Sequence, residues 1–286
     1  MRSTLCLLSC EAVGGEAAEV MPAAAAVELV HNFSLIHDDI EDDSYERHHR
    51  PTVWRVWGQS QAINAGDAMF ALAYLALHGL EEKGISYQRI SRATQVLSHA
   101  CLELCEGQYL DLDYERRLDI TVDEYLDMAA KKTAALLAVS CSLGAYLGGG
   151  HSQVVDCLHL FGKELGMAYQ IRDDSMGIWG NEEHTGKTAG DISRRKKTLP
   201  VVYGLQNAKG EDRKTLETLY AQGSMDERDV AEVARILEQT GARDYAWNLA
   251  EQYHSRAVAQ LEAAGLEARK QAPLKDLACF LSQRDF

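Results

Sequence analysis

The stretch AAAAVELVHNFSLIHDDIEDDSYERHHRPT, residues 23–52, places five acidic residues in six positions directly after a long apolar run. The apolar residues recur at helical spacing, which predicts a helix that ends at about Asp43. On such a helix Asp38 and Asp42 lie one turn apart on the same face, where like charges repel by roughly a few tenths of a kcal/mol. Two arginines and two histidines follow within a few residues, so crowded carboxylates lie next to cations.

A metal site explains this acidic cluster better than a solvated surface does. Acidic residues at the C-terminal end of a helix oppose the helix macrodipole. The almost wholly apolar residues before them predict a buried helix whose carboxylates lie at the mouth of a core. Mg²⁺ is typically held by one or two carboxylates together with substrate phosphates. A solvated helix end is the alternative, because acidic runs are common on protein surfaces.

A second acidic cluster lies in YQIRDDSMGIWGNEEHTGKTAGDISRRKKTLP, residues 169–200, where an apolar helix gives way to a polar loop. Its polar residues are Gln170, Asp173, Asp174, Lys187, Asp191, Lys196 and Lys197. If the two acid-tipped helices face each other across a bundle, the carboxylates would hold Mg²⁺ and the cations would hold anionic oxygens. The pattern predicts a diphosphate bridged by metal ions, which also explains how a chain of net charge −14 could bind an anion.

The remaining sequence predicts an all-α protein. Runs rich in Ala, Leu, Glu and Arg with a period near 3.6 fill most of the 286 residues, and only four prolines occur. We expect about ten helices in a single domain, residues 1–286. The expected helices span residues 22–43, 60–82, 87–114, 121–147, 152–179, 198–207, 211–221, 226–239, 241–264 and 273–283. Glycines at 14–15 and 148–150 are typical of helix ends.

Charge and composition narrow the class of protein. A net charge of −14 argues against nucleic-acid binding, which uses basic patches. Seven cysteines without a Cys-x-x-Cys pair suit a reducing cytoplasm, where they are expected to be small buried hydrophobes. No apolar stretch approaches the roughly 20 residues that span a bilayer. We therefore expect a cytoplasmic protein without an integral membrane segment.

The chain resembles the trans-isoprenyl (polyprenyl) diphosphate synthases over essentially its whole length, and geranylgeranyl diphosphate synthases in particular. The matching segments, in order, are HDDIEDDS, RPTVW, AINAGDAMFALA, EGQYLDLD, KKTAALL, YQIRDDSMGIWG, TGKTAGD and KKTLP. The resemblance implies an isoprenoid synthase-type bundle around a central apolar cavity and a homodimer. It also implies an enzyme that joins isopentenyl diphosphate head to tail to an allylic prenyl diphosphate, with three Mg²⁺ ions when substrate is bound.

The resemblance implies a role for each matching residue. Asp38, Asp39 and Asp42 would hold Mg²⁺ on the allylic diphosphate, and Asp173 and Asp174 would hold the third ion with Gln170 nearby. The residues expected to grip or support that diphosphate are Arg47, Lys132, Lys187, Lys197, Thr133, Gln108 and Asp191. The residues expected at the isopentenyl diphosphate site are Arg2 and His31, and those expected to limit product length near twenty carbons are Phe33 and Ser34. Taken alone, a buried histidine such as His31 is more often a core residue, and only its place in the motif favours a substrate site. For Phe33, ordinary core packing is the alternative.

Three departures from the family pattern stand out. The lysine of its Gly-Lys-x-x-Arg segment would lie before Met1, so we expect an earlier start or a truncated N-terminal helix, and a weaker acceptor site. His48 stands where the family has a second arginine and is expected to bind substrate in its place, with Arg50 close by as the alternative. Gly177 replaces the last aspartate of the second acidic motif, which predicts weaker or altered metal binding there.

Three other functions fit parts of the sequence. The pairs Glu28/His31 and Glu251/His254 have the Glu-x-x-His spacing of di-iron bundles, but that function leaves both aspartate clusters unexplained. A class I terpene cyclase shares the fold and the first acidic motif, yet the chain has no Asn/Asp-x-x-Ser-x-x-x-Glu segment. A non-catalytic partner subunit would explain the missing lysine but not the intact first acidic motif.

Overall fold

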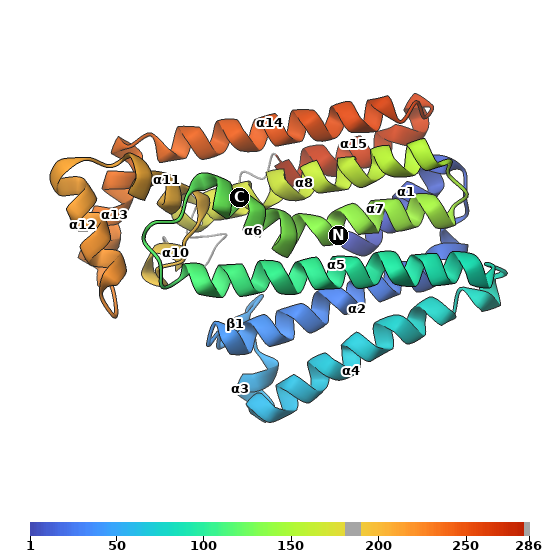
Figure 1. The fold of residues 1–286 in the computed structure, drawn as a ribbon, viewed down its shortest axis with the longest axis horizontal. Helices are drawn as coiled ribbons and strands as arrows, with labels where there is room; N and C mark the ends of the chain where they lie inside the picture. Colours follow the sequence, from blue (N-terminus) through green and yellow to red (C-terminus); the bar gives the residue numbers. More distant parts are fainter. Residues whose placement is uncertain (181–189, 283–286) are drawn as a thin grey trace. The chain divides into compact units, whose positions relative to one another are not determined.

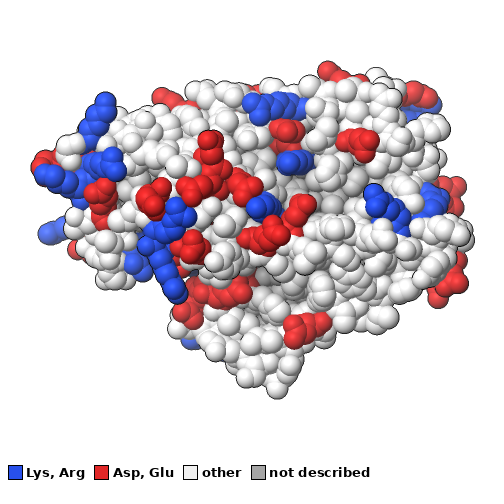
Figure 2. Space-filling view, viewed as in Figure 1, with Lys and Arg blue, Asp and Glu red and all other residues white. Residues whose placement is uncertain are grey.

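The computed structural model describes residues 1–180 and 190–282, so the predicted site residue Lys187 lies outside the described residues. Helices make up almost all of the regular structure there, which confirms the predicted all-α fold (Figure 1). None of the described helices combines the length and the apolarity needed to cross a membrane. On the face drawn in Figure 2, acidic and basic side chains are interspersed rather than gathered into one broad basic surface.

The chain divides into two compact units, and the predicted single domain stays a prediction. Unit 1 comprises Met1–Cys101, Leu136–His159 and Ala264–Leu274, and unit 2 comprises Leu102–Ala135, Leu160–Ala263 and Lys275–Phe286. The division falls within four helices that have residues in both units. These are α5 (Tyr87–Tyr114), α7 (Ala135–Leu147), α8 (Ser152–Trp179) and α15 (Ala268–Ser282).

Unit 1 is built around the long apolar helix that ends in the first acidic cluster. Its own elements are α1 (Arg2–Val13), α2 (Ala17–Glu41), β1 (Glu46–Arg47), β2 (Arg50–Pro51), α3 (Val53–Trp57), α4 (Gln59–His78) and the short 3₁₀ helix η1 (Glu81–Lys83). Helices α1 and α4 both pack against α2, and α4 runs beside it in Figure 1. Because Val20, Val27 and Val30 of α2 are fully buried, this packing fixes the helix that carries the acids.

Unit 2 packs several helices around the second half of α8. Its own elements are α6 (Val122–Ala129), the π-helical turn η2 (Ala130–Ala134), α10 (Gly190–Ser193), α11 (Leu199–Asn207), α12 (Gly210–Ala221), α13 (Glu227–Gln239) and α14 (Ala242–Ala263). One buried cluster joins Met128 of α6, Ile171 of α8, Val202 of α11 and Ala246 of α14. This core holds the second acidic cluster at a defined place beside α6 and α11.

Helix α1 is absent from the sequence prediction. Its residues have a short apolar run and no side-chain N-cap, so no local signal marks its start. The helix forms because Leu5, Cys6 and Cys10 are completely buried. A Cβ on Gly144 of α7 would lie 1.9 Å from the carbonyl oxygen of Cys6, so glycine is needed where α1 and α7 approach each other.

The predicted start of the second helix at Pro22 is wrong, because α2 begins at Ala17. A proline within a helix removes one backbone hydrogen bond. The full burial of Val20 stabilises the turn that precedes the proline, so tertiary packing overrides the local signal. The helix end was predicted within two residues, since α2 finishes at Glu41.

Candidate functional site

The first acidic cluster lies in the last turn of α2. Asp38 and Asp39 belong to the helix, and Asp42 is its C-cap residue, with its backbone N–H bonded to the carbonyl oxygen of Asp38 at 2.9 Å. Asp39 is only 4% exposed, and its burial raises the pKa of its carboxyl group. The prediction of carboxylates at the C-terminal end of a buried helix is therefore confirmed.

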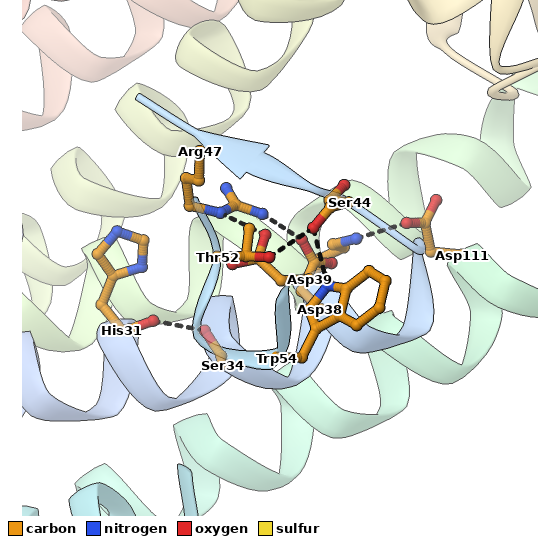
Figure 3. Close-up of polar contacts among 10 residues, drawn as sticks. His31, Ser34, Asp38, Asp39, Ser44, Arg47, Thr52, Trp54 and Asp111 are labelled. Carbon is orange, nitrogen blue, oxygen red and sulfur yellow. Dashed lines mark hydrogen bonds and ion pairs between the residues drawn. The ribbon is translucent and has the colours of Figure 1, made fainter. Parts of the chain in front are cut away.

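Arg47 returns to this cluster from the β1–β2 hairpin. It donates from Nε to Oδ1 of Asp39 at 2.7 Å and from Nη2 to Oδ2 of Asp38 at 2.9 Å, as Figure 3 shows. One cation therefore serves two adjacent carboxylates, and it lowers the pKa of Asp39 against the effect of burial. The structure pairs Arg47 with the acids, and its predicted contact with a diphosphate stays a prediction.

The hairpin that carries Arg47 is fixed at its base. The carbonyl oxygen of Ser44 accepts hydrogen bonds from Thr52 Oγ1 and Trp54 Nε1, both at 2.8 Å (Figure 3). At the tip, His48 and His49 have φ values of 50° and 60°. Two successive residues at positive φ are typical of the tight turns that join hairpin strands. His48, predicted to bind substrate, is thus a turn residue of this hairpin.

A second polar group joins α1 and α2. Arg2 donates from Nη1 to Nε2 of His31 at 2.9 Å, and the backbone N–H of Ser3 donates to Glu28 Oε2 at 3.4 Å. Burial, followed by the positive charge of Arg2, lowers the pKa of His31 to about 3, whereas Glu28 acts in the opposite direction. His31 is therefore a neutral acceptor. The two residues expected at one substrate site do lie together.

Phe33 and Ser34 are consecutive residues of α2 with different partners. Phe33 is buried, and its ring meets the rings of Phe70 at 5.0 Å and His37 at 5.8 Å between centroids. Ser34 donates its hydroxyl to the carbonyl oxygen of His31 at 2.8 Å. Packing of Phe33 in an aromatic row agrees with both interpretations of this residue, a core side chain and a limit on product length.

In unit 2, the adjacent aspartates of α8 have different surroundings. Asp173 is exposed, whereas Asp174 is 5% exposed. Asp174 accepts hydrogen bonds from the Tyr125 hydroxyl, from the backbone N–H of Leu199 at 2.8 Å and from Gln170 Nε2 at 2.8 Å. Burial raises the pKa of Asp174 to about 7, although these three donors lower it. Asp174 therefore ties α8 to α6 and α11, and Asp173 is the carboxylate turned to solvent.

The π-helical turn η2 contributes Lys132 and Thr133. Lys132 Nζ lies 2.5 Å from Asp111 Oδ2 of α5, and Thr133 donates to Gln170 Oε1 at 2.7 Å. Gln170 thus links Thr133 to Asp174. Gln108, on α5, is half-buried. The sequence analysis identified neither Tyr125 nor Asp111, although Asp111 lies within the matching segment EGQYLDLD and so carried a usable signal.

Lys197 is a buried cation of unit 2. It is 5% exposed, donates to the carbonyl oxygen of Glu115 at 3.3 Å and lies 4.9 Å from the centroid of the Tyr220 ring. Burial, with a smaller effect from Arg195, lowers its pKa to about 8. A cation poised in this way can hold an anion at neutral pH. Asp191, the remaining residue predicted to support the diphosphate, lies beside Gly177 of α8.

The chemistry of the donors fits Mg²⁺. Both clusters offer carboxylate oxygens, the hard ligands that Mg²⁺ prefers, and Mg²⁺ usually completes its shell with water and phosphate. Among the residues that the structure describes, no three His, Cys, Asp or Glu side chains form a group that could hold a metal ion by themselves. Glu251 and His254, the second pair of the di-iron alternative, belong to α14.

Comparison with known proteins relates the whole chain to one group of enzymes. The sequence profile of a family described as "Polyprenyl synthetase" matches residues 1–237. A short chain isoprenyl diphosphate synthase of Methanothermobacter thermautotrophicus is 41% identical over 286 residues, 100% of this chain and 86% of that protein. Two Mycobacterium tuberculosis enzymes are also similar. A geranylgeranyl diphosphate synthase is 42% identical over 265 residues (92% and 74% of the two chains). A (2E,6E)-farnesyl diphosphate synthase is 38% identical over 288 positions (99% and 79%).

Solved structures give the same relationship. The geranylgeranyl pyrophosphate synthetase of Pyrococcus horikoshii matches with a TM-score of 0.92 at 35% identity, covering 99% of this chain and 85% of that chain. The geranylgeranyl pyrophosphate synthase of Corynebacterium glutamicum, complexed with isoprenyl diphosphate and magnesium, matches with a TM-score of 0.90 at 27% identity, covering 99% and 86%.

Proposed function

The chain belongs to the polyprenyl synthetase family and is a prenyltransferase, and from this premise we propose that it joins isopentenyl diphosphate head to tail to an allylic prenyl diphosphate with Mg²⁺. The observation that carries the proposal is that two apolar helices each carry a pair of aspartates near the C-terminal end. These are Asp38 and Asp39 of α2, bonded to Arg47, and the exposed Asp173 with the buried Asp174 of α8. Relatives named for farnesyl and for geranylgeranyl products are similarly close. We propose the twenty-carbon product, because Phe33 is bulky and Ser34 is small.

The proposed reaction is an electrophilic addition. Loss of diphosphate from the allylic substrate leaves a carbocation, the double bond of isopentenyl diphosphate attacks it, and loss of a proton completes the product. Mg²⁺, three ions in the loaded enzyme, would stabilise the negative charge of the departing diphosphate. The residues proposed to hold it are Asp38, Asp39, Asp42, Asp173 and Asp174.

Lysine and arginine side chains of the protein are proposed to bind the diphosphates together with Mg²⁺. Lys132 and Lys197, with Arg47, would neutralise oxygens of the allylic diphosphate as charge develops on it. Arg2 and the neutral His31 would orient isopentenyl diphosphate, the arginine by charge and the histidine by a hydrogen bond. Apolar residues of α2 around Phe33 would surround the growing chain and keep water from the carbocation.

Product analysis tests the proposal. Isotope-labelled isopentenyl diphosphate is incubated with Mg²⁺ and, separately, with dimethylallyl, geranyl and farnesyl diphosphates, and chain lengths are measured. We expect condensation products up to twenty carbons, and a rate at least about a hundredfold lower for Asp38→Asn. Glu82→Gln, which changes an exposed carboxylate after α4, is the matched control and should retain the parent rate.

The same incubations, together with an iron assay of the purified protein, distinguish the proposed function from the other functions. Release of a hydrocarbon from an allylic diphosphate alone would favour a terpene cyclase. Binding of allylic diphosphate without condensation under any condition would favour a non-catalytic subunit. Stoichiometric iron in the purified protein would favour a di-iron bundle.

We also propose that the enzyme is a homodimer formed through α4. Four large apolar side chains of this helix are exposed, namely Ile63, Phe70, Leu72 and Leu75. Contact of these side chains with water is unfavourable, and a second copy of the chain would cover part of this apolar surface. Light scattering should give twice the chain mass of 31.7 kDa. Leu75→Glu should give the monomer, whereas Leu160→Glu, at an exposed leucine of α8, should not.

A further inference from the structure

Gly177 is an unexpected residue for its position in α8. It lies four residues after Asp173, one helical turn along the same face, where the second acidic motif of the family has an aspartate. Glycine in a helix interior is roughly 1 kcal/mol less favourable than alanine. A glycine here therefore needs a reason in the surrounding structure, and from the sequence alone it implies a lost carboxylate.

The space beside Gly177 is filled by Asp191. A Cβ built on Gly177 would lie 1.9 Å from Oδ2 of Asp191 and 2.7 Å from its Cγ, far inside van der Waals contact. The Asp191 carboxylate thus takes the volume in which a side chain at position 177 would begin. Any larger residue at 177 has to displace this carboxylate.

The backbone on both sides of this contact is anchored. Ile178, next to Gly177, and Ile192, next to Asp191, are buried in the same hydrophobic cluster. The carbonyl oxygen of Asp191 also accepts a hydrogen bond from the backbone N–H of Lys196 at 2.9 Å. Packing, rather than chance rotation of one side chain, brings Asp191 to Gly177.

We propose that Asp191 supplies, from a different part of the chain, the carboxylate that the second acidic cluster lacks at position 177. Asp173 and Asp191 would then form the carboxylate pair of this cluster, and Gly177 would be the residue that makes room for it. Mg²⁺ sites commonly use one or two carboxylates, so the pair is sufficient. The inference rests on the proposed function, and it reverses the expectation that Gly177 weakens metal binding.

The proposal predicts that restoring the family's aspartate does not help. In Gly177→Asp, the new carboxylate would compete with Asp191 for one volume, and two like charges would meet there. Gly177→Ala displaces the Asp191 carboxylate without adding charge. The reciprocal exchange, Gly177→Asp with Asp191→Gly, moves the carboxylate to the helix while leaving the space that it needs.

Calorimetry of Mg²⁺ binding in the presence of inorganic pyrophosphate tests this assignment without using turnover. We expect Asp191→Asn and Gly177→Ala to weaken Mg²⁺ binding about 10- to 100-fold, Gly177→Asp to bind no more tightly than the parent, and the exchange variant to recover most of the loss. Asp244→Asn removes an exposed carboxylate of α14 and should bind like the parent. Circular dichroism confirms that each variant is folded.

Two results with the variants would overturn the assignment: parent-like Mg²⁺ binding by Asp191→Asn, or tighter binding by Gly177→Asp. If the variants at position 177 do not fold, Mg²⁺ binding by Asp191→Asn alone decides whether Asp191 contributes to the metal site. A parent protein that binds Mg²⁺ and pyrophosphate through Asp191 but forms no prenyl product would contradict the proposed function and leave the Asp191 assignment intact. A parent protein that binds no Mg²⁺ with pyrophosphate would contradict the assignment itself.

Discussion

Arg2 holds His31 in its neutral form, with Nη1 of the arginine 2.9 Å from Nε2 of the histidine. The contact joins the first residues of α1 to the middle of α2, and burial and the arginine's charge both disfavour a protonated ring. A neutral imidazole can accept a hydrogen bond from Arg2 or give one to a substrate, but it adds no charge to the site.

The lowered pKa of His31 makes folding stability depend on acidity. Its pKa is about 3 in the folded chain, against 6.5 for an unperturbed histidine, so the unfolded chain binds the extra proton between these values. Stability is therefore retained above pH 6.5 and falls as the pH drops from 6.5 toward 3. Urea unfolding of the parent and His31→Gln across this range should show a steeper loss for the parent. Parallel curves for the two proteins would contradict a buried neutral His31.

Lys197 should give the affinity for pyrophosphate an alkaline limit. Its pKa is lowered from 10.5 to about 8, so the ammonium is charged at pH 7 and loses its proton as the pH rises through 8. We expect pyrophosphate affinity, measured calorimetrically, to fall between pH 7 and 9 in the parent. Lys197→Arg keeps its charge and should show a smaller fall. An identical fall in both proteins would assign the pH dependence to another group.

The Tyr125 hydroxyl should contribute to stability more than to metal binding. Tyr125→Phe removes one of three donors to a carboxylate that is almost completely buried, which should cost about 1–3 kcal/mol in the free energy of unfolding. Denaturant titration measures this loss. Tyr109→Phe, at an exposed tyrosine of α5, is the matched control and should unfold like the parent. Equal stability of all three proteins would show that Asp174 does not depend on Tyr125.

Product length should respond to Phe33. Phe33→Ala removes a buried ring from the aromatic row with Phe70, which opens space along α2 and should give products longer than those of the parent. Chromatography of dephosphorylated products measures the change. Phe280→Ala, at an exposed ring of α15, controls for loss of an aromatic side chain. Unchanged product lengths in Phe33→Ala would make this residue an ordinary part of the core.

Local sequence signals predicted the long helices well and the packing-dependent ones poorly. The predicted helices 87–114 and 152–179 coincide with α5 and α8, because uninterrupted helical periodicity defines both. Helix α1 could not be predicted, since its stability comes from burial against α2 and α7. The start of α2 was misplaced for the same reason.

The candidate site shows the same division between local and tertiary information. Spacing along the helices identified both acidic clusters, and the predicted second cluster included Gln170. Spacing could not show that Asp173 is exposed while Asp174 is buried, since successive residues point about 100° apart and only the neighbouring helices decide which direction is the core. The contacts of Asp174 with Tyr125 and of Gly177 with Asp191 join segments far apart in the sequence, so no local pattern predicts them.

The hairpin that returns Arg47 to the end of α2 gives the first acidic cluster its own internal counterion. Arg47 partly neutralises two carboxylates of this cluster, those of Asp38 and Asp39, and this pairing is part of the folded structure. An ion that took the two carboxylate oxygens bonded to Arg47 would have to displace its guanidinium. The displaced arginine would then be able to pair with an anion, so that metal binding and anion binding at this cluster would be coupled.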